Sequence, residues 1–380
     1  MACIELIATA AFGLEAVVAR ELKQLGYEDC KVENGKVTFF ADELAICRCN
    51  LWLRSADRLL LKMGQFKAMS FEELFEQTKA LPWPEWLPKN ACFPVEGKSV
   101  RSTLYSVPDC QAIVKKAIVE KMKQQYRLNW FPEDGSCYKV EVALLKDVAT
   151  LTIDTSGAGL HRRGYRKLTA AAPLRETLAA AMVFLSNWTS PQILWDPFCG
   201  SGTIPIEAAM IGRNIAPGLR RTFVAESWPN IKAAYWQQAR EEARHMAKLN
   251  EPLDIRGTDI DSEVLSLARY HSRQVGVEDA IHWQRQDFRH LSSKHKYGYL
   301  IANPPYGHRL GEIKEAEQIY QDLGSVLSPL DTWSFFILTS HKDFERLFNR
   351  RASKRRKLYN GRLECHYYQY FGPRPPRRLK

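Results

Sequence analysis

The chain has 380 residues, of which 45% are hydrophobic, and it carries a formal net charge of +11 with a pI of about 9.1. This length exceeds one ordinary hydrophobic core, so two or three domains are expected. No apolar run approaches the roughly 20 residues of a membrane span, and the N-terminus lacks the pattern of a signal peptide. We therefore expect a cytoplasmic protein without membrane association.

The nine cysteines and nine histidines show no regular spacing. The nearest cysteine pair is Cys47 and Cys49, and neither a C-x-x-C nor an H-E-x-x-H pattern occurs. We therefore expect reduced thiols and no bound metal. The positive charge indicates a polyanionic partner instead, because basic residues concentrate at 161–167, 350–357 and 374–380. A basic protein without such a partner is the alternative.

The front of the chain has the pattern of two small α+β units, residues 1–53 and 54–155. In the first unit we expect a strand at 3–10, a helix at 13–26, a hairpin at 32–40 that turns at Asn34-Gly35, and a helix at 41–51. In the second unit we expect a strand at 58–66, a helix capped by Ser70, a strand at 91–95, a helix at 108–126, and paired strands at 138–145 and 149–155.

A connector and a larger domain follow. Residues 156–190 begin with a basic, glycine-containing segment and continue into an Ala- and Leu-rich helix at 172–188. In residues 191–380, apolar strands alternate with helices, which predicts an α/β domain with an open parallel sheet.

A glycine turn follows the first strand of this domain. Ile193-Leu194-Trp195 predicts a buried strand, and the loop from Asp196 to Thr203 contains Cys199, Gly200 and Gly202. A strand, a glycine turn and a helix form the first crevice of a doubly wound sheet. The loop lacks the glycine spacing of a dinucleotide site and the lysine of a P-loop. Asp196 at the strand end suits a ligand that carries an ammonium group.

Two more acidic strand ends follow in order. Asp259 ends the second strand, where an acidic residue typically binds ribose hydroxyls. Asp287, with Phe288, stands where an adenine amino group needs an acceptor. Three successive strand ends thus match the amino acid, ribose and adenine of S-adenosylmethionine. For Asp261 we expect a helix N-cap instead.

The fourth strand, at 299–302, ends in Asn303-Pro304-Pro305-Tyr306. An exocyclic amino group is a poor nucleophile, and two acceptors, the Asn303 side-chain oxygen and the Pro304 carbonyl, could hold its hydrogens and stabilise the developing charge. The two prolines restrict the turn, and Tyr306 could stack on the base. A proline turn after a buried strand, without catalytic function, is the alternative at this point.

The motifs at 196–207 and 302–307 together resemble those of the bacterial THUMP-containing class I RNA methyltransferases, in particular the guanine-N2 half of the rRNA enzyme RlmL. The segments 161–166 and 172–176 resemble the linker and helix that precede the first motif in this family. The resemblance implies a ferredoxin-like domain, a THUMP domain that binds RNA and a Rossmann-like methyltransferase domain. It also implies N2-methylguanosine as the product, and it favours 23S rRNA over tRNA as the RNA that is methylated.

The resemblance assigns roles to individual residues. Asp259 is expected to bind the ribose of the cofactor, and Asp287 and Phe288 are expected to bind the adenine. The methionine side is expected to lie against the loop that contains Asp196, Cys199, Gly200, Gly202 and Thr203. The flipped guanine falls to Asn303, Pro304, Pro305 and Tyr306. The residues that we expect to contact RNA in the basic connector are Arg162, Arg163, Tyr165, Arg166 and Lys167. RlmL has a second methyltransferase domain, whose modification we expect to be absent because this chain stops at Lys380.

Three alternatives remain from the sequence. DNA adenine-N6 methylation uses the same four-residue turn, but the two α+β units in front resemble RNA-binding modules rather than a DNA reader. The motifs do not distinguish rRNA from tRNA as the substrate of guanine-N2 methylation. A non-catalytic RNA-binding assembly factor is disfavoured, because the acidic positions and Asn303 are intact.

Overall fold

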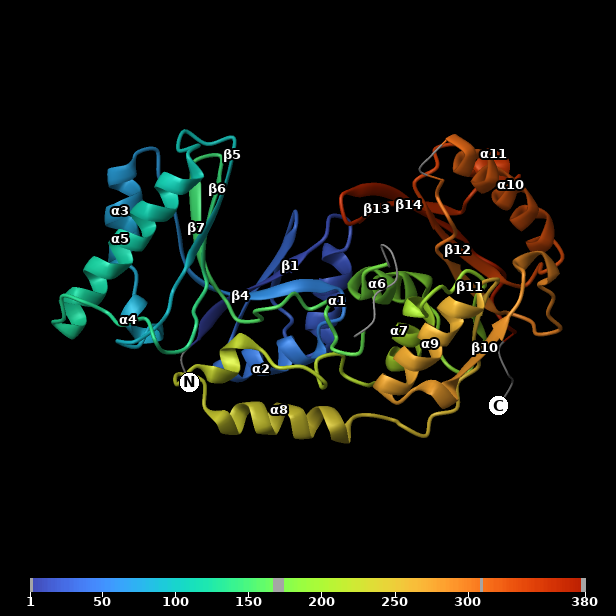
Figure 1. The fold of residues 1–380 in the computed structure, drawn as a ribbon, viewed down its shortest axis with the longest axis horizontal. Coiled ribbons are helices and arrows are strands. Elements are labelled where there is room, and N and C mark those ends of the chain that lie inside the picture. Colours follow the sequence, from blue (N-terminus) through green and yellow to red (C-terminus); the bar gives the residue numbers. More distant parts are fainter. Residues whose placement is uncertain (1–2, 167–173, 308–309, 377–380) are drawn as a thin grey trace. The chain divides into compact units, whose positions relative to one another are not determined.

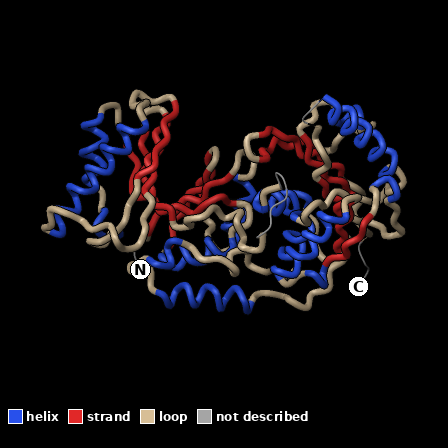
Figure 2. Tube along the Cα trace, viewed as in Figure 1, coloured by secondary structure: helices blue, strands red, loops and turns tan. Residues whose placement is uncertain are grey.

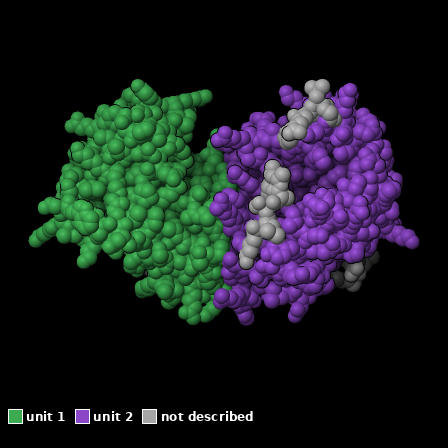
Figure 3. Space-filling model, viewed as in Figure 1, with its two compact units in different colours: residues 1–10, 18–160, 221–242 green, residues 11–17, 161–220, 243–380 purple. Residues whose placement is uncertain are grey.

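The computed structural model describes residues 3–166, 174–307 and 310–376. Lys167, one of the expected RNA contacts, lies outside these residues. The chain divides into two compact units (Figure 3). Unit 1 consists of residues 1–10, 18–160 and 221–242, and unit 2 consists of residues 11–17, 161–220 and 243–380.

Unit 1 is built on one seven-stranded sheet with the order β2-β3-β1-β4-β7-β6-β5 (Figure 1). Its strands are β1 (Ile4–Ala10), β2 (Cys30–Glu33), β3 (Lys36–Ala41), β4 (Ala56–Lys67), β5 (Val95–Val100), β6 (Val140–Leu145) and β7 (Val148–Asp154). The helices that lie wholly or mostly in this unit are α1 (Glu15–Gln24), α2 (Glu43–Trp52), α3 (Phe71–Ala80), α4 (Trp83–Trp86), α5 (Val107–Tyr126), η1 (Val224–Ser227) and α8 (Ala233–His245).

Local sequence signals explain several of these elements. Glu33 pairs with Lys36, which confirms the two-residue hairpin turn, and Gly35 takes φ +77° there, as this turn requires. The Ser70 hydroxyl accepts a hydrogen bond from the Glu73 amide at 3.1 Å, which confirms the predicted N-cap of α3.

The strand predicted at 91–95 is wrong. The strand of this region is β5, which begins at Val95 and pairs in parallel with β6, and Cys92 makes only an isolated bridge to Cys137. Ala91 and Phe93 are buried although their backbone is not in a strand. The apolar run at 91–95 therefore indicates burial and not pairing in a sheet. β5 itself alternates half-buried and exposed residues.

The long strand β4 joins the two front units that the sequence suggested. It pairs antiparallel with β1 on one side and with β7 on the other. The ferredoxin-like and THUMP-like parts therefore share one continuous sheet. β4, which follows the predicted domain limit at residue 53, is the central strand that connects them.

A segment inside the predicted 191–380 domain packs in unit 1. Residues 221–242 lie between α7 and β9 in the chain but belong to this unit. The Trp228 ring stacks on Tyr138 with centroids 4.5 Å apart, and its indole N–H donates to the Cys137 carbonyl at 2.9 Å. Arg48 forms a bidentate pair with Glu242 at 2.8 and 2.7 Å. Sequence order alone did not indicate this exchange.

Unit 2 contains a second seven-stranded sheet with the order β10-β9-β8-β11-β12-β14-β13. Figure 2 shows strands in red and helices in blue. Its strands are β8 (Leu194–Asp196), β9 (Ile255–Asp259), β10 (Ile281–Arg285), β11 (Tyr299–Ala302), β12 (Ser334–Thr339), β13 (Lys354–Asn360) and β14 (Leu363–Tyr370). Its helices are α6 (Glu176–Ser186), α7 (Thr203–Gly212), α9 (Ser262–Val275), η2 (Glu278–Ala280), η3 (Phe288–His290), α10 (Leu310–Leu327) and α11 (Phe344–Leu347). The first five strands of this order are parallel and β14 is antiparallel. The expected α/β fold is therefore confirmed, with an antiparallel hairpin added at one edge.

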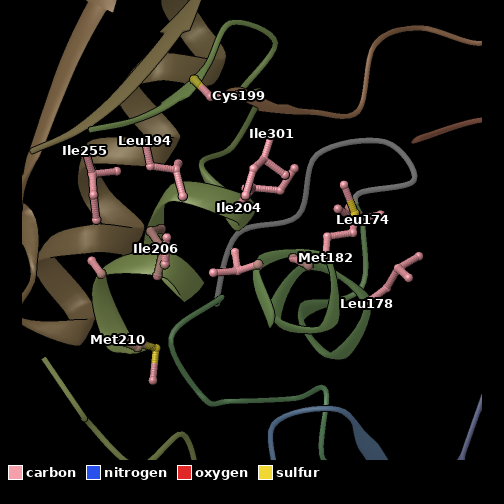
Figure 4. Packing of buried hydrophobic residues seen from close by; sticks show 14 of the residues in the cluster. Leu174, Leu178, Met182, Leu194, Cys199, Ile204, Ile206, Met210, Ile255 and Ile301 are labelled. Carbon is pink, nitrogen blue, oxygen red and sulfur yellow. The ribbon is translucent and has the colours of Figure 1, made fainter. Parts of the chain in front are cut away.

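Alternating strand residues of unit 2 face two hydrophobic cores. Leu194 and Ile301 pack with helices α6, α7 and α9 (Figure 4), whereas their neighbours Trp195 and Leu300 pack with α10. Because both faces are covered, the central strands β11 and β12 are almost uniformly apolar. Among the described helices, none is long and apolar enough to cross a membrane.

Candidate active site

Four neighbouring strands end at the same edge of the unit 2 sheet. β10, β9, β8 and β11 are adjacent and parallel, so the residues at their carboxyl ends gather in one crevice. Asp287 follows β10, Asp259 ends β9, Asp196 ends β8, and Asn303 follows β11.

A cavity of about 930 Å³ lies along this edge. Of the residues expected to bind cofactor or base, the structure places Asp259, Asp287, Phe288, Asn303, Pro304, Pro305 and Tyr306 in its lining. The residues Asp196, Cys199, Gly200, Gly202 and Thr203 do not line it, whereas their neighbours Pro197 and Phe198 do. The cavity is therefore large enough for a small-molecule ligand, and the glycine loop lies at its margin.

Asp196 is buried beneath that loop. Its carboxylate accepts a hydrogen bond from the Phe198 amide at 3.1 Å, and its side chain is shielded from solvent. Burial raises the pKa of Asp196 well above the usual range, and the nearby Asp259 carboxylate adds to this rise. Burial therefore favours the protonated form of Asp196 more than it would for a solvent-exposed carboxyl.

The glycine loop is held by the next strand. The Gly200 amide donates to the Asp259 carboxylate at 2.9 Å, and the Cys199 amide donates to the Thr258 carbonyl at 3.1 Å. Gly202 has φ +86°, and a Cβ there would lie 2.7 Å from the Trp283 ring. The absent side chain at Gly202 thus accommodates protein packing and not a ligand, while a Cβ on Gly200 would meet open space.

Two of the acidic residues also cap helices. The Asp261 side chain accepts from the Glu263 amide at 2.7 Å as the N-cap of α9, as predicted. Asp287 accepts from the Arg289 amide at 2.9 Å, and its carboxylate forms an ion pair with the Arg289 guanidinium at 3.2 Å. Asp287 therefore has a partly compensated charge but retains acceptor capacity toward the cavity.

The turn after β11 presents acceptors to the cavity. The Tyr306 hydroxyl donates to the Asn303 side-chain oxygen, which orients the amide. The Pro304 carbonyl accepts no hydrogen bond from the described residues. Tyr306 is only 9% exposed, and its burial raises the pKa of its hydroxyl. Tyr306 therefore lies folded against the turn, with limited surface for stacking on a base.

A buried tyrosine that the sequence did not indicate fixes this turn from below. The Tyr320 hydroxyl of α10 donates to the Pro305 carbonyl at 2.8 Å and is 2.9 Å from the Thr339 hydroxyl. Because Tyr320 has one proton, Thr339 must be the donor in the second bond. Burial raises the pKa of Tyr320 to about 12, so its phenol remains a donor.

Two of the connector residues that we expected to contact RNA, Arg163 and Tyr165, are buried. Arg163 is buried and makes a bidentate pair with Glu207 of α7, at 3.2 and 3.3 Å. Tyr165 is also buried. Arg166 is partly buried, with an ion pair to Glu176 of α6 at 3.3 Å. Arg163 and Tyr165 therefore belong to the interior, because opposite charges and packing compensate their burial, whereas Arg162 is exposed.

The cavity includes residues to which we assigned no role from the sequence. These are Ile260, which is 61% exposed at the end of β9, Phe198, Arg175 and Arg289, and the turn residues Asn360, Gly361, Arg362 and Leu363 between β13 and β14. The sequence signal that could have indicated Ile260 is its position directly after the acidic strand end Asp259. The β13–β14 turn is far away in sequence, and only the sheet order brings it to the site. The described residues hold no cluster of His, Cys, Asp or Glu that could bind a metal ion.

Comparison with solved structures defines the class. The chain is 51% identical, with a TM-score of 0.94 and coverage of 98% of this chain and 97% of the other, to a structure from Listeria monocytogenes described as a predicted N6-adenine-specific DNA methylase. It is 46% identical, with a TM-score of 0.94 and coverage of 99% and 100%, to SMU.472, described as a putative methyltransferase complexed with SAH, S-adenosylhomocysteine. The fold is that of an S-adenosylmethionine-dependent methyltransferase, which confirms the expected cofactor.

Family models match the chain in the expected order. The RlmL ferredoxin-like domain matches residues 5–60, the THUMP domain matches 68–154, and the RMKL-like methyltransferase domain matches 163–369. The chain belongs to the THUMP-containing, RlmL-like methyltransferase family. The expected types of domain are confirmed, whereas the limits at residues 53, 155 and 190 stay predictions.

Two curated relatives illustrate the family. The chain is 52% identical over 377 residues to "Putative RNA methyltransferase YpsC" of Bacillus subtilis (strain 168), with coverage of 99% of this chain and 98% of that protein. It is 34% identical over 375 residues to ribosomal RNA large subunit methyltransferase K/L of Shewanella baltica (strain OS195), with coverage of 97% and 53%. The chain thus spans about half the length of the K/L protein.

We predict that substitution by alanine destabilises the protein more at Gly202 than at Gly200. Gly202→Ala should lower the free energy of unfolding by at least about 2 kcal/mol, because the backbone is left-handed and the new Cβ meets Trp283. Gly200→Ala should cost about 1 kcal/mol, from the backbone alone. Chemical denaturation of both variants measures the difference, and equal losses would contradict the packing role of Gly202.

We predict that Arg163 stabilises the fold and does not bind RNA directly. Arg163→Met should lower the free energy of unfolding by about 3–5 kcal/mol, because Glu207 is left buried without its partner. The exposed neighbour Arg162 is the control, and Arg162→Met should change stability by less than about 0.5 kcal/mol. A stable Arg163→Met protein with a reduced salt dependence of RNA binding would restore the original interpretation.

We predict that Asp196 destabilises the ligand-free protein as the pH rises. Its folded-state pKa is raised, so its contribution to stability is full below its ordinary pKa of about 3.9 and is lost as the pH rises through the folded value. Asp196→Asn keeps the acceptor for the Phe198 amide but does not titrate. Its melting temperature relative to the wild-type protein should therefore increase with pH, and a pH-independent difference would refute this assignment.

Proposed function

We propose that this protein transfers a methyl group from S-adenosylmethionine to the exocyclic N2 of a guanine in RNA, with 23S rRNA as the favoured substrate. The observation that carries the proposal is the pair of acceptors at the end of β11, the Asn303 side-chain oxygen and the Pro304 carbonyl. They line the same cavity as the acidic ends of β9 and β10.

The lining residues fit the expected cofactor. Asp259 offers its carboxylate to ribose hydroxyls, and Asp287 offers an acceptor to the adenine amino group. The apolar side chains of Ile260 and Phe288 are suited to the two faces of the adenine ring. When bound, the cofactor supplies an electrophilic methyl group on a sulfonium.

The loop after β8 completes this assignment at the methionine end. Asp196 supplies a negative charge beneath it, and Gly200 supplies open backbone. Cys199, Gly202 and Thr203 keep the loop in its conformation. An ammonium group close to Asp196 would favour the ionised carboxylate and so offset part of its burial cost.

The acceptor pair suits an amine that loses its lone-pair delocalisation during attack. Two hydrogens on the nitrogen meet two oxygens, and the Asn303 oxygen retains a second acceptor position while Tyr306 donates to it. The turn is held by Pro304, Pro305 and the Tyr320 hydroxyl, so the acceptors need little reorganisation. No strong base is required, because the proton can leave after the methyl group has been transferred.

RNA is favoured over DNA as the substrate by the front of the chain. A THUMP domain at 68–154 is an RNA-binding module, and both curated relatives are named as RNA or ribosomal RNA methyltransferases. DNA adenine-N6 methylation is the second candidate, since one similar structure carries that description and the turn accepts either amine. Guanine N2 in tRNA is the third.

We predict that Asn303→Ala reduces turnover by about 10²–10³-fold, because it removes one of two acceptors that act on the developing charge. The affinity for S-adenosylhomocysteine should remain within about threefold of the wild-type value, since Asn303 is assigned to the base. Tyr306→Phe keeps the ring and serves as the milder variant, with a smaller loss than Tyr306→Ala. Isothermal titration and single-turnover kinetics make the comparison, and a parallel loss of cofactor affinity in Asn303→Ala would argue against the acceptor pair.

The substrate is tested by nucleoside mass spectrometry of rRNA, tRNA and DNA from a deletion strain. Loss of N2-methylguanosine from 23S rRNA, restored by the wild-type protein and not by Asn303→Ala, supports the proposal. Loss of N2-methylguanosine from tRNA alone, or of N6-methyladenine from DNA, selects one of the rivals.

A further inference from the structure

The hairpin of β13 and β14 carries a concentration of positive charge at one edge of the unit 2 sheet. Residues 350–362 contain seven Lys or Arg and no Asp or Glu. β13 is the terminal strand in the order of the described sheet (Figure 1). Lysines on an edge strand also hinder pairing between sheets, so charge alone does not identify a ligand.

The hairpin arranges some of these cations in a line. Arg355, Lys357 and Tyr359 alternate along β13 and therefore point to the same face, whereas Leu358 points into the core. Arg355 and Lys357 are exposed, and Arg362 is exposed in the turn that follows. We call Arg355, Lys357, Tyr359 and Arg362 the basic stripe.

The stripe keeps a positive net charge. Arg355 lies 3.9 Å from Glu345, and Lys357 lies 2.5 Å from Glu364. Arg362 has no ion-pair partner among residues 3–166, 174–307 and 310–376. The hydrogen bond with Glu364 raises the pKa of Lys357, so it remains charged at neutral pH. Exposed ion pairs of this kind are weak and screened by salt, so phosphates can compete for these cations.

Aromatic rings stand beside the cations. The Tyr359 ring is 5.6 Å from the Lys357 ammonium and 6.3 Å from the Phe12 ring, and Phe12 is 57% exposed. Surfaces that bind single-stranded nucleic acid combine cations for the backbone with rings on which unpaired bases stack. Edge protection requires the charges but not the rings.

The stripe leads into the cavity of the active site. The turn residues from Asn360 to Leu363 line the same cavity as Asn303 and Tyr306. The seven residues of β13 extend about 20 Å, at ~3.3 Å for each of the six steps between them, so the edge is long enough to contact more than one phosphate of an RNA strand. The geometry therefore connects a basic and aromatic edge directly to the position of the target base.

We propose that the basic stripe binds the single-stranded RNA that flanks the target nucleotide. Arg355 and Lys357 bind phosphates, Tyr359 with Phe12 stacks an unpaired base, and Arg362 binds the backbone at the mouth of the cavity. The methyltransferase domain thus has an RNA-binding surface of its own, in addition to the THUMP domain. The inference rests on RNA as the substrate but not on which amine is methylated.

The test compares two double variants of the full-length protein with the same change in charge. The stripe variant is Arg355→Gln with Lys357→Gln. The control is Arg273→Gln with Lys248→Gln, two exposed cations of unit 2 outside the cavity, of which Arg273 pairs with Glu278 at 2.8 Å as Lys357 does with Glu364. Both variants should bind S-adenosylhomocysteine as the wild-type protein does, which verifies folding.

Binding of a short single-stranded RNA is measured over a series of salt concentrations. The stripe variant should lose affinity on the order of tenfold, and its slope of log K against log salt should fall by about 1.4, from ~0.7 per lost contact. The control should keep the wild-type slope. Equal losses of RNA affinity in both variants would show that only the net charge of the protein matters. An unchanged RNA affinity of the stripe variant would assign its cations to edge protection. Either result overturns the proposal.

A third variant tests the stacking contact. Tyr359→Ala should weaken binding of the single strand more than that of a duplex RNA, because paired bases cannot stack on the ring. Equal effects on the two RNAs would overturn the assignment to single-stranded RNA. No methyl transfer is measured in these experiments, so their outcome is independent of the assignment to guanine N2.

Discussion

The polar edge of unit 2 depends on the packing of Trp283 against two glycines. Trp283 of β10 pairs in register with Gly257 of β9, and its indole also covers Gly202 in the loop after β8. A side chain on either glycine would overlap the ring, so the loop and the two strands approach closely only because both positions lack a Cβ. This approach brings the Gly200 amide to the Asp259 carboxylate. The arrangement of the acidic strand ends therefore rests on an apolar contact beneath them.

The acceptor turn is fixed by a different kind of contact. Its backbone is restricted by two prolines, and a chain of hydroxyls from Thr339 through Tyr320 reaches the Pro305 carbonyl. Tyr320 and Thr339 are buried, so the hydrogen bond between their hydroxyls does not compete with water. A site that stabilises charge on a weak nucleophile gains from acceptors that are already in position. The hydroxyls behind this turn thus contribute to the chemistry that we propose for it.

Positive charge has two separate uses in unit 2. In the connector, Arg163 and Arg166 pair with Glu207 and Glu176, and they hold helices α7 and α6 next to the glycine loop. At the β13 edge of the sheet, by contrast, Arg355 and Lys357 are exposed and have only weak or screened partners. In the sequence the two clusters look alike. They differ because carboxylates on neighbouring helices meet the first cluster in the fold and largely miss the second.

The sequence by itself determined the class of fold and the chemical groups at the strand ends. Hydrophobic strands followed by Asp196, Asp259, Asp287 and Asn303 are local patterns, and a parallel sheet brings such ends to one edge whatever lies between them. Only the tertiary structure decided which residues reach the cavity. It buried Asp196 and Arg163, turned Tyr306 onto Asn303, brought the β13–β14 turn to the site, and placed residues 221–242 in unit 1. These outcomes depend on partners distant in the chain, and the composition of a segment does not specify the partner that its side chains will meet.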